Sequence, residues 1–324
     1  MTELVLSIRN LSVEIPTRVG IVKPVDGVSY DIAKGEILGV VGESGAGKSM
    51  AGNAVIGLLN PPAHIAGGEI WLNGKRIDPL TGEKMRRVRG KEIGMIFQDP
   101  LTSLNPLLTI GDQLTETMLT HLSIGRRDAE KRAIAALDEV GIPGAAERID
   151  SYPHEFSGGM RQRVVIALAL CAEPSLVIAD EPTTALDVSV QAQIIALLKR
   201  LCRERGTAVM LITHDMGVIA EAADRVAVMY AGRLAELGSV RDVLTQPSHP
   251  YTHGLMASTP LASQGKARLH QIPGSMPRLT MLPDGCAFHP RCSYAQDVCR
   301  QEPGPKIGDG RAACLFPLMA EDVA

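Results

Sequence analysis

Residues 37–59 read ILGVV-GESGAGKS-MAGNAVIGLL, and this stretch decides the fold. The apolar run Ile37–Val41 predicts a short buried parallel strand, and Ser49–Leu59 predicts a helix that ends before Asn60-Pro61-Pro62. Between them, Gly42–Ser49 matches G-x-x-x-x-G-K-S in full. A glycine loop in this strand–loop–helix context predicts a site where backbone N–H groups surround the phosphates of a nucleotide.

The loop predicts specific roles for two of its side chains. Lys48 is expected to reach the β- and γ-phosphates, and the Ser49 hydroxyl is expected to bind Mg²⁺. The start of the following helix adds a partial positive charge. The predicted phosphate-binding residues are Gly42, Glu43, Ser44, Gly45, Ala46, Gly47, Lys48 and Ser49.

A second apolar strand, Leu176–Ala179, is followed by two acids, Asp180 and Glu181. Carboxylates at the carboxyl end of a parallel strand lie where α/β folds bind ligands. Asp180 fits a ligand of Mg²⁺ that acts through a water, and Glu181 fits the residue that polarises the attacking water. Together with the loop, these acids predict a site that binds a nucleotide with Mg²⁺ and activates a water for hydrolysis.

The rest of residues 1–240 alternates between strand and helix patterns, which predicts a mostly parallel α/β sheet. Further strands are expected at Leu4–Ile15, Val28–Ile32, Glu69–Leu72, Ile93–Phe97, Ala208–Ile212 and Val226–Tyr230. A charged helical insertion is expected from Ile110 to Ile149, and the apolar run Val164–Ala172 predicts a buried helix. Cys171 and Cys202 lie in apolar helical segments, and we expect them to pack in the core.

The composition narrows the function classes. A net charge of −3 and an aromatic content of 3% provide neither the basic surplus nor the stacking rings of a nucleic-acid surface. The basic run Lys84–Arg89 is short and predicts a solvated face. The sequence contains no apolar segment of roughly 20 residues, the length of a membrane span, and we do not expect Met1–Leu4 to begin a signal peptide. We therefore expect a cytosolic chain with reduced cysteines.

The order of the remaining motifs resembles the ATPase subunits of ABC transporters over about residues 1–240. Ser157-Gly158-Gly159-Met160-Arg161-Gln162 is similar to the signature sequence of that family, with Met160 where Gln is usual and Phe156 where Leu is usual. Gln98 resembles the Q-loop glutamine, and His214 resembles the switch histidine that contacts the γ-phosphate. Ala185-Leu186-Asp187 resembles the D-loop at the dimer contact.

This resemblance implies a P-loop NTPase fold: a RecA-like, mostly parallel sheet, an antiparallel N-terminal β-subdomain, and a helical subdomain at about residues 100–165. It implies Glu181, His214 and Gln98 as catalytic residues, and Ser49, Gln98 and Asp180 around Mg²⁺. It also implies a head-to-tail dimer, in which Ser157, Gly158 and Gly159 of one chain complete the ATP site of the other.

One family feature is missing. Relatives often stack adenine on an aromatic ring near residues 17–23, but Thr17-Arg18-Val19-Gly20-Ile21-Val22-Lys23 contains none. We expect aliphatic groups such as Val22 to contact the base instead.

After about Ser239 the periodicity weakens and Pro, Gly and Cys become frequent, which predicts a small module at residues 241–324. Its four cysteines have the spacing C-x5-C-x6-C-x14-C, and they are Cys286, Cys292, Cys299 and Cys314. In a cytosolic chain this indicates metal ligation more than disulfides, although the C-x2-C pairs of structural zinc are absent. An iron–sulfur cluster, zinc, and free or disulfide-bonded cysteines remain open, and His289 fits a structural turn better than a ligand.

The segments Gln246–Thr252 (QPSHPYT) and Gly285–Cys292 (GCAFHPRC) resemble the C-terminal extension of oligopeptide and dipeptide importer ATPases. Some members of that group are thought to carry a [4Fe–4S] cluster on these cysteines. The resemblance implies a second, related ATPase subunit, two membrane permease subunits and an extracytoplasmic substrate-binding protein. It places the chain peripherally on the cytoplasmic face of the membrane, with the permease near Gln98 and the helical insertion.

An alternative is a soluble ABC-type ATPase that acts on nucleic acid or ribosomes. Such proteins usually carry long coiled-coil insertions or two tandem ATPase domains, whereas this sequence has one P-loop and no sustained heptads. The peptide importer is therefore the favoured interpretation. The sequence leaves its cargo open among dipeptides, longer peptides, nickel complexes and other small solutes.

Overall fold

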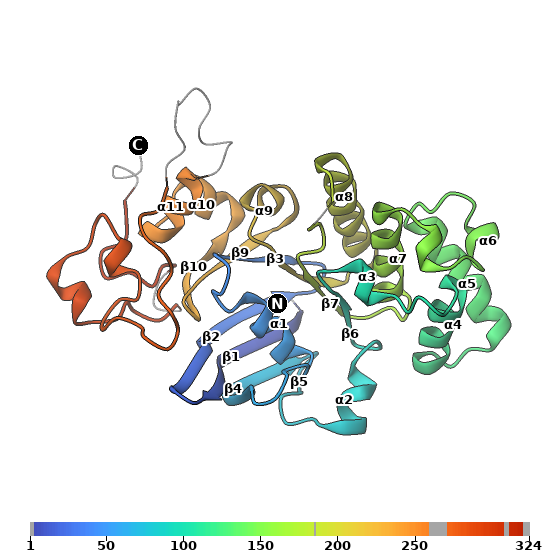
Figure 1. The fold of residues 1–324 in the computed structure, drawn as a ribbon, viewed down its shortest axis with the longest axis horizontal. Coiled ribbons are helices and arrows are strands. Elements are labelled where there is room, and N and C mark those ends of the chain that lie inside the picture. The colour runs from blue at the N-terminus through green and yellow to red at the C-terminus, as the bar shows by residue number, and fades with distance from the viewer. Residues whose placement is uncertain (1–2, 185, 259–270, 308–310, 320–324) are drawn as a thin grey trace. The chain divides into compact units, whose positions relative to one another are not determined.

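The computed structural model describes residues 3–184, 186–258, 271–307 and 311–319 (Figure 1). Its contacts divide the chain into two compact units. One unit contains the described residues up to Val5, residues 33–36 and residues 79–211; the other contains residues 6–32, 37–78 and the described residues after 211. Each unit is therefore assembled from segments that are far apart in the sequence.

The first unit contains parallel strands. β6 (Ile93–Ile96) pairs in parallel with β7 (Leu176–Asp180), and β8 (Ala208–Ile212) lies beside β7. Every residue of β7 and β8 is buried; β8 is apolar throughout, and β7 is apolar up to its last residue, Asp180. The strand ends predicted from these runs agree with the structure to within a residue.

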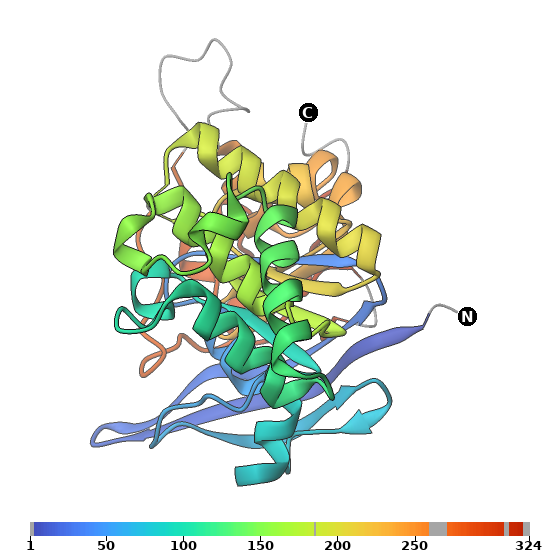
Figure 2. The same ribbon diagram turned by 90° about the vertical axis from the view of Figure 1, so that its right-hand side faces the viewer.

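Helices make up the rest of the first unit. They are α2 (Gly82–Val88), α3 (Pro100–Ser103), α4 (Ile110–His121), α5 (Arg126–Glu139), α6 (Ala145–Arg148), the 3₁₀ helix η1 (Pro153–Glu155), α7 (Gly158–Leu170) and α8 (Val188–Arg205). Figure 2 shows α4 to α7, in green, gathered into one group. On α4, Ile110, Leu114 and Met118 form a buried stripe at helical spacing. The helices expected between residues 110 and 149 are therefore present.

Cys171 and Cys202 are buried in this helical region, as predicted. Burial raises the pKa of each thiol to about 12, so both are neutral at physiological pH. A neutral buried thiol behaves as a small apolar side chain, which agrees with a packing role.

The second unit contains two sheets. The antiparallel sheet has the order β2-β1-β4-β5, from β1 (Leu4–Thr17), β2 (Gly20–Ala33), β4 (His64–Leu72) and β5 (Lys75–Arg76). In the other sheet, β3 (Ile37–Val41) is parallel to β9 (Arg225–Tyr230), and β10 (Arg233–Ser239) is antiparallel to β9. The helices are α1 (Lys48–Val55), α9 (Met216–Ala222), α10 (Val240–Thr245), α11 (Pro250–Ala257), and the 3₁₀ helices η3 (His289–Arg291) and η4 (Asp297–Arg300).

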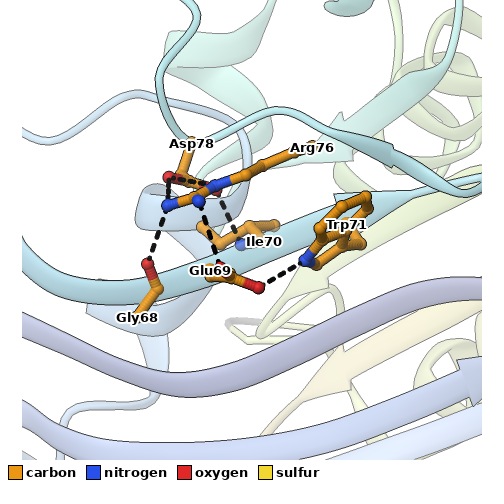
Figure 3. Close-up of polar contacts among 6 residues, drawn as sticks. All are labelled: Gly68, Glu69, Ile70, Trp71, Arg76 and Asp78. Atoms are coloured by element: carbon orange, nitrogen blue, oxygen red, sulfur yellow. Dashed lines mark hydrogen bonds and ion pairs between the residues drawn. The ribbon is translucent and has the colours of Figure 1, made fainter.

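The short strand β5 is fixed to β4 by Arg76 (Figure 3). Its guanidinium group donates to the Asp78 carboxylate at 2.9–3.1 Å, to Glu69 Oε1 at 3.1 Å and to the Gly68 carbonyl at 3.4 Å. Asp78 also accepts the Ile70 N–H at 2.9 Å. These bonds hold Arg76 and Asp78 against β4 at this edge of the antiparallel sheet.

The structure differs from the sequence prediction at the end of α1. The helix was predicted to reach Leu59, but it ends at Val55 because Gly57 takes a left-handed conformation with φ 66°. The Gly57 N–H then donates to the Ala54 carbonyl at 3.2 Å, and the Leu58 N–H donates to the Asn53 carbonyl at 2.8 Å. This pair of bonds is a Schellman motif, which satisfies the last helical carbonyls.

The C-terminal extension is attached to β10 through Glu236, whose side chain is fully buried. Its carboxylate accepts the N–H groups of Ser248 and His249 at 2.9 Å each and is paired with Arg311 at 3.2 Å. Backbone bonds between Leu237 and Arg311 and between Ala313 and Ala235 add residues 311–313 to the strand edge. The buried charge is thus fully partnered.

None of the described helices is both long and apolar enough to span a membrane. Residues 271–307 and 311–319 contain only the two 3₁₀ turns as helical structure, together with the bridge to β10. Polar contacts with β10 and the buried ring of Phe288 help to hold this described part of the extension. The assignment of residues 241–324 to a separate module stays a prediction.

Candidate functional site

The glycine loop of the second unit connects β3 to α1. Gly47, at the N-cap of α1, has φ 103°, and a Cβ at this position would lie 1.9 Å from the Pro24 carbonyl oxygen. Only glycine fits here, because the conformation and the contact both exclude a side chain. The Ala46 N–H donates to the Glu43 carbonyl at 3.1 Å, which closes the turn.

Lys48 is buried within this loop, with 6% of its surface exposed. Its Nζ donates to the Gly42 carbonyl at 2.8 Å and to the Glu43 carbonyl at 3.1 Å. The positive charge is therefore held against the loop, next to the start of α1. A helix start with a fixed ammonium group beside it is a site for an anion.

His214 lies in the second unit, just beyond the end of β8, and is exposed. Its backbone neighbours are fixed. Thr213 donates its N–H to the Val40 carbonyl at 3.1 Å, and Asp215 caps α9 through the Gly217 N–H at 2.7 Å. His214 is thus an exposed residue in a turn whose neighbouring residues are hydrogen-bonded.

The two predicted acids lie in the first unit at the end of β7. Asp180 is 9% exposed, and Glu181 follows it with φ 47°, a left-handed conformation that is strained for a residue other than glycine. Glu181 Oε2 accepts from Gln98 Nε2 at 3.3 Å and from Thr184 Oγ1 at 2.9 Å. The structure thus brings Gln98 to Glu181, and it adds Thr184, which the sequence analysis did not identify.

The signature segment begins α7 in the first unit. Ser157 is the N-cap, and its Oγ accepts the Met160 N–H at 3.4 Å. Ser157 and Gly158 are exposed, whereas Phe156 is buried, with 2% of its surface exposed. Phe156 therefore supplies the apolar anchor of the usual Leu, and the helix start is open to solvent.

The D-loop is described only in part, because Ala185 lies outside the described residues. Asp187 is the N-cap of α8 and accepts the Val190 N–H at 2.9 Å. This bond, and a second one from the Ser189 hydroxyl, hold the pKa of the Asp187 carboxyl below its usual range. Asp187 therefore serves the helix start as an ionised cap.

The segment expected to meet adenine is the tip of the β1–β2 hairpin. Thr17 Oγ1 donates to the Gly20 carbonyl at 2.7 Å, Val19 and Ile21 are exposed, and Val22 is half-buried. Aliphatic surface is available on this tip. Contact of Val22 with the base stays a prediction.

The four cysteines of the extension line one small cavity, together with the apolar side chains of Phe288, Ala295, Leu315 and Phe316. All four are free thiols. Burial raises the pKa of Cys286 and Cys292, and it raises the pKa of Cys314 to about 11. Among the residues that the structure describes, no group of three or more His, Cys, Asp or Glu is placed to hold a metal ion.

His289 also lines this cavity and is part of the turn η3. Its ring Nδ1 is 3.0 Å from the Cys286 carbonyl oxygen, and its N–H donates to the same carbonyl. Both contacts are local, as in a structural turn.

Known proteins resemble the chain over both parts. The protein-family model described as "ABC transporter" matches residues 25–184. The family model described as "Oligopeptide/dipeptide transporter, C-terminal region" matches residues 235–299. The chain is 50% identical over 307 residues to the dipeptide transport ATP-binding protein of Bacillus subtilis, covering 94% of the chain and 92% of that protein. It is 47% identical over 317 residues to the oligopeptide transport ATP-binding protein of Salmonella typhimurium, covering 97% and 94%.

Solved structures resemble it as well. A dimeric bacterial ABC transporter cassette is 28% identical, with a TM-score of 0.65, and the match covers 73% of this chain and 99% of that one. A dimeric ATP-binding cassette in a post-hydrolysis state with ADP and phosphate gives the same TM-score at 27% identity, with the same coverage. The P-loop cassette fold, with antiparallel and mixed sheets, is thereby confirmed.

Proposed function

The chain belongs to the ABC transporter family as an ATP-hydrolysing subunit of the oligopeptide and dipeptide transport type, and from this premise we propose how its parts serve peptide import. The observation that carries the proposal is the loop Gly42–Ser49, which holds the buried ammonium group of Lys48 beside a helix start. ATP binds there. Its hydrolysis drives import of di- or oligopeptides through a multi-subunit transporter.

Residues of each unit are proposed to act on ATP. In the second, the backbone N–H groups of Gly42–Ser49 and the Lys48 ammonium group bind the phosphates, and His214 contacts the γ-phosphate. In the first, Glu181 accepts a proton from the attacking water. The Glu181 carboxylate is oriented for this role by its bonds to Gln98 and Thr184.

Mg²⁺ supplies charge neutralisation of the phosphates when it is bound. The residues that would hold it are Ser49, Gln98 and Asp180. They offer hydroxyl, amide and carboxylate oxygens, which are the kind of ligand that Mg²⁺ prefers. Asp180 is nearly buried at the carboxyl end of β7, so its carboxylate has a fixed position for this task.

We further propose that the ATP site is composite. The exposed helix start at Ser157 and Gly158 is a second anion-binding end, and it has the form expected of a surface that completes the site of a partner chain. The two cassette structures named above, which are of the same cassette protein, are both dimers. The partner would be a second ATPase subunit, related to this chain but different from it.

The remaining partners follow from the same proposal. Two membrane permease subunits would form the pathway, an extracytoplasmic binding protein would deliver the peptide, and this chain would lie peripherally on the cytoplasmic face. The match to a peptide-transporter C-terminal region at residues 235–299 supports this assembly over an ATPase that acts on nucleic acid or ribosomes. We place the boundary between cassette and extension near residue 240, where the β10 strand has just ended.

Co-purification tests the assembly. With an affinity tag on this chain, detergent extracts of its own cells should yield one related ATPase chain and two permease chains, each at about one copy per tagged chain. Quantitative mass spectrometry measures the ratio, and extracts from untagged cells provide the control. Recovery of this chain alone, or together with ribosomes or nucleic acid, would contradict the proposed assembly.

The extension is proposed to hold a [4Fe–4S] cluster on Cys286, Cys292, Cys299 and Cys314. The four thiols line one cavity with apolar walls, which is the donor set and environment that such clusters use. A cluster bonds each cysteine to a different iron, so the sulfurs need not converge on one point. A single zinc ion requires four ligands around one centre, and the described residues contain no such group. The proposal of a cluster therefore rests on the four thiols and the cavity that they share.

The cluster predicts the colour and metal content of the protein. Chain purified without oxygen should be brown and contain about four iron and about four sulfide per chain. Replacement of Cys299 by serine should remove most of the iron, whereas Cys202→Ala, which alters a core cysteine, should retain it. Iron and sulfide analysis measures both. Colourless protein with one zinc per chain would refute the cluster.

A further inference from the structure

The C-terminal extension contacts the P-loop directly, within the second unit. Tyr251 of α11 is fully buried, and its hydroxyl accepts the Glu43 N–H at 2.9 Å. Arg291 of η3 donates from Nη1 to both carboxylate oxygens of Glu43, at 3.0 Å each. The guanidinium group is nearly buried, with 6% of the side chain exposed, whereas the Glu43 side chain is 28% exposed. The second residue of the loop is thus held by two side chains more than 200 positions away.

Arg291 itself is fixed in place. Its Nε donates to the Pro273 carbonyl at 2.9 Å, and its guanidinium carbon lies 5.8 Å from the ring centre of Tyr230 and 6.0 Å from that of Phe288. Cations over aromatic faces at this range are attracted to the ring. An arginine so fixed loses little further freedom when it pairs with Glu43.

Aromatic residues are scarce in this chain, yet three of them meet here. The ring centres of Tyr230 and Tyr251 are 4.6 Å apart, those of Tyr230 and Phe288 are 5.2 Å apart, and those of Tyr251 and Phe288 are 5.4 Å apart. Tyr230 lies in β9, Tyr251 in α11, and Phe288 just before η3, so the three rings connect β9 to two segments of the extension. The aromatic side chains that contact Arg291 therefore also pack against the ring of Tyr251, and this fixes the position of its hydroxyl.

All the polar groups of Glu43 are occupied. Its N–H is bound by Tyr251, its carboxylate by Arg291, and its carbonyl by Lys48 Nζ at 3.1 Å and by the Ala46 N–H. Displacement of Glu43 would therefore move the acceptor that positions the Lys48 ammonium group. A carboxylate this close to the loop also repels a polyphosphate unless a cation offsets its charge.

We propose that Arg291 and Tyr251 are positioning residues for ATP: they fix Glu43 in the P-loop, and Arg291 neutralises its carboxylate. This inference rests on the proposed function of the P-loop. Because Arg291 immediately precedes Cys292, it also couples the order of the cysteine-rich extension to nucleotide affinity. An ion pair that only fastened the extension would leave phosphate binding unchanged.

The test compares nucleotide affinity in full-length variants. Arg291→Met should weaken ATP binding about tenfold and ADP binding less, and leave adenosine binding unchanged, because the effect acts on the phosphates. Arg278→Met, an exposed arginine of the same extension, should bind ATP like the parent chain. Titration calorimetry measures the dissociation constants, and a thermal melt confirms that each variant is folded.

Charge rescue separates neutralisation from packing. Adding Glu43→Gln to Arg291→Met should restore ATP affinity to within about threefold of the parent, because the unpaired carboxylate is gone. Wild-type ATP affinity in Arg291→Met, an equal loss for adenosine, or no rescue would each overturn the inference. If Arg291→Met does not fold, Tyr251→Phe decides: about threefold weaker ATP binding supports the inference, and unchanged binding overturns it.

The two proposals fail in different ways. Unchanged ATP binding in Lys48→Ala would overturn the P-loop assignment itself. A strong loss in Lys48→Ala, combined with wild-type affinity in folded Arg291→Met and Tyr251→Phe, would overturn only the role of the extension.

Discussion

Replacing Glu181 by glutamine is expected to lower the rate of ATP hydrolysis by at least about a hundredfold while ATP still binds. Glutamine keeps the shape of the side chain and can still bond to Gln98 and Thr184, but its amide cannot accept a proton from water. Phosphate release by the purified complex measures turnover, and a filter-binding assay measures retained ATP. The proposed dimer should accumulate in its ATP-bound form.

Glu173→Gln is a matched control for this variant. Glu173 also lies in the first unit and also has a left-handed backbone, with φ 56° against 47° for Glu181. Its carboxylate pairs with Arg132 at the surface, 3.4 Å away, so its replacement should leave turnover unchanged. Near-normal hydrolysis by Glu181→Gln would remove Glu181 from the role of proton acceptor.

The buried parallel strands could be predicted closely from the sequence. Ile37–Val41 and Ala208–Ile212 have the predicted bounds, because both are apolar runs bordered by polar or glycine residues. The bounds of the half-buried strand β2 were harder to predict from the sequence. It spans Gly20–Ala33, whereas only Val28–Ile32 was expected, since Lys23 and Pro24 interrupt the apolar pattern. Its pairing comes from neighbours that a local pattern does not contain.

The β10 strand was missed for a similar reason. Arg233–Ser239 contains a charged residue at its centre, Glu236, which reads as a surface position. In the structure this carboxylate is fully buried because Arg311 and the N–H groups of residues 248 and 249 surround it. A buried, fully partnered charge depends on distant segments, so a local sequence pattern predicts the opposite.

The order of the motifs predicts the residues of the candidate site, and their roles stay predictions; the contacts that support these residues could not be predicted. The strained backbone at Glu181 and its bond to Thr184 depend on how the end of β7 turns. The pairing of Arg291 with Glu43 joins positions 248 residues apart. Both residues lay within motifs recognised in the sequence, yet their partnership is tertiary and becomes visible only in the fold.

Lys48→Ala is expected to weaken ATP binding by about 10- to 150-fold, the effect of losing a charge-assisted hydrogen bond worth about 1.5–3 kcal/mol. The loss should be greater for ATP than for ADP, because the ammonium group is expected to reach the β- and γ-phosphates. Lys75→Ala, which changes an exposed lysine of β5, is the control and should bind ATP normally.

Arginine at position 48 should not restore binding. The Nζ of Lys48 lies between the carbonyls of Gly42 and Glu43 in a buried space, and a planar guanidinium group is larger and donates in a fixed fork. If charge alone mattered, Lys48→Arg would bind ATP almost as well as the parent chain. Weak binding by both variants, with melting temperatures near that of the parent, would instead indicate that the loop selects a compact ammonium group. Parent-like affinity in Lys48→Ala would mean that the phosphates bind elsewhere.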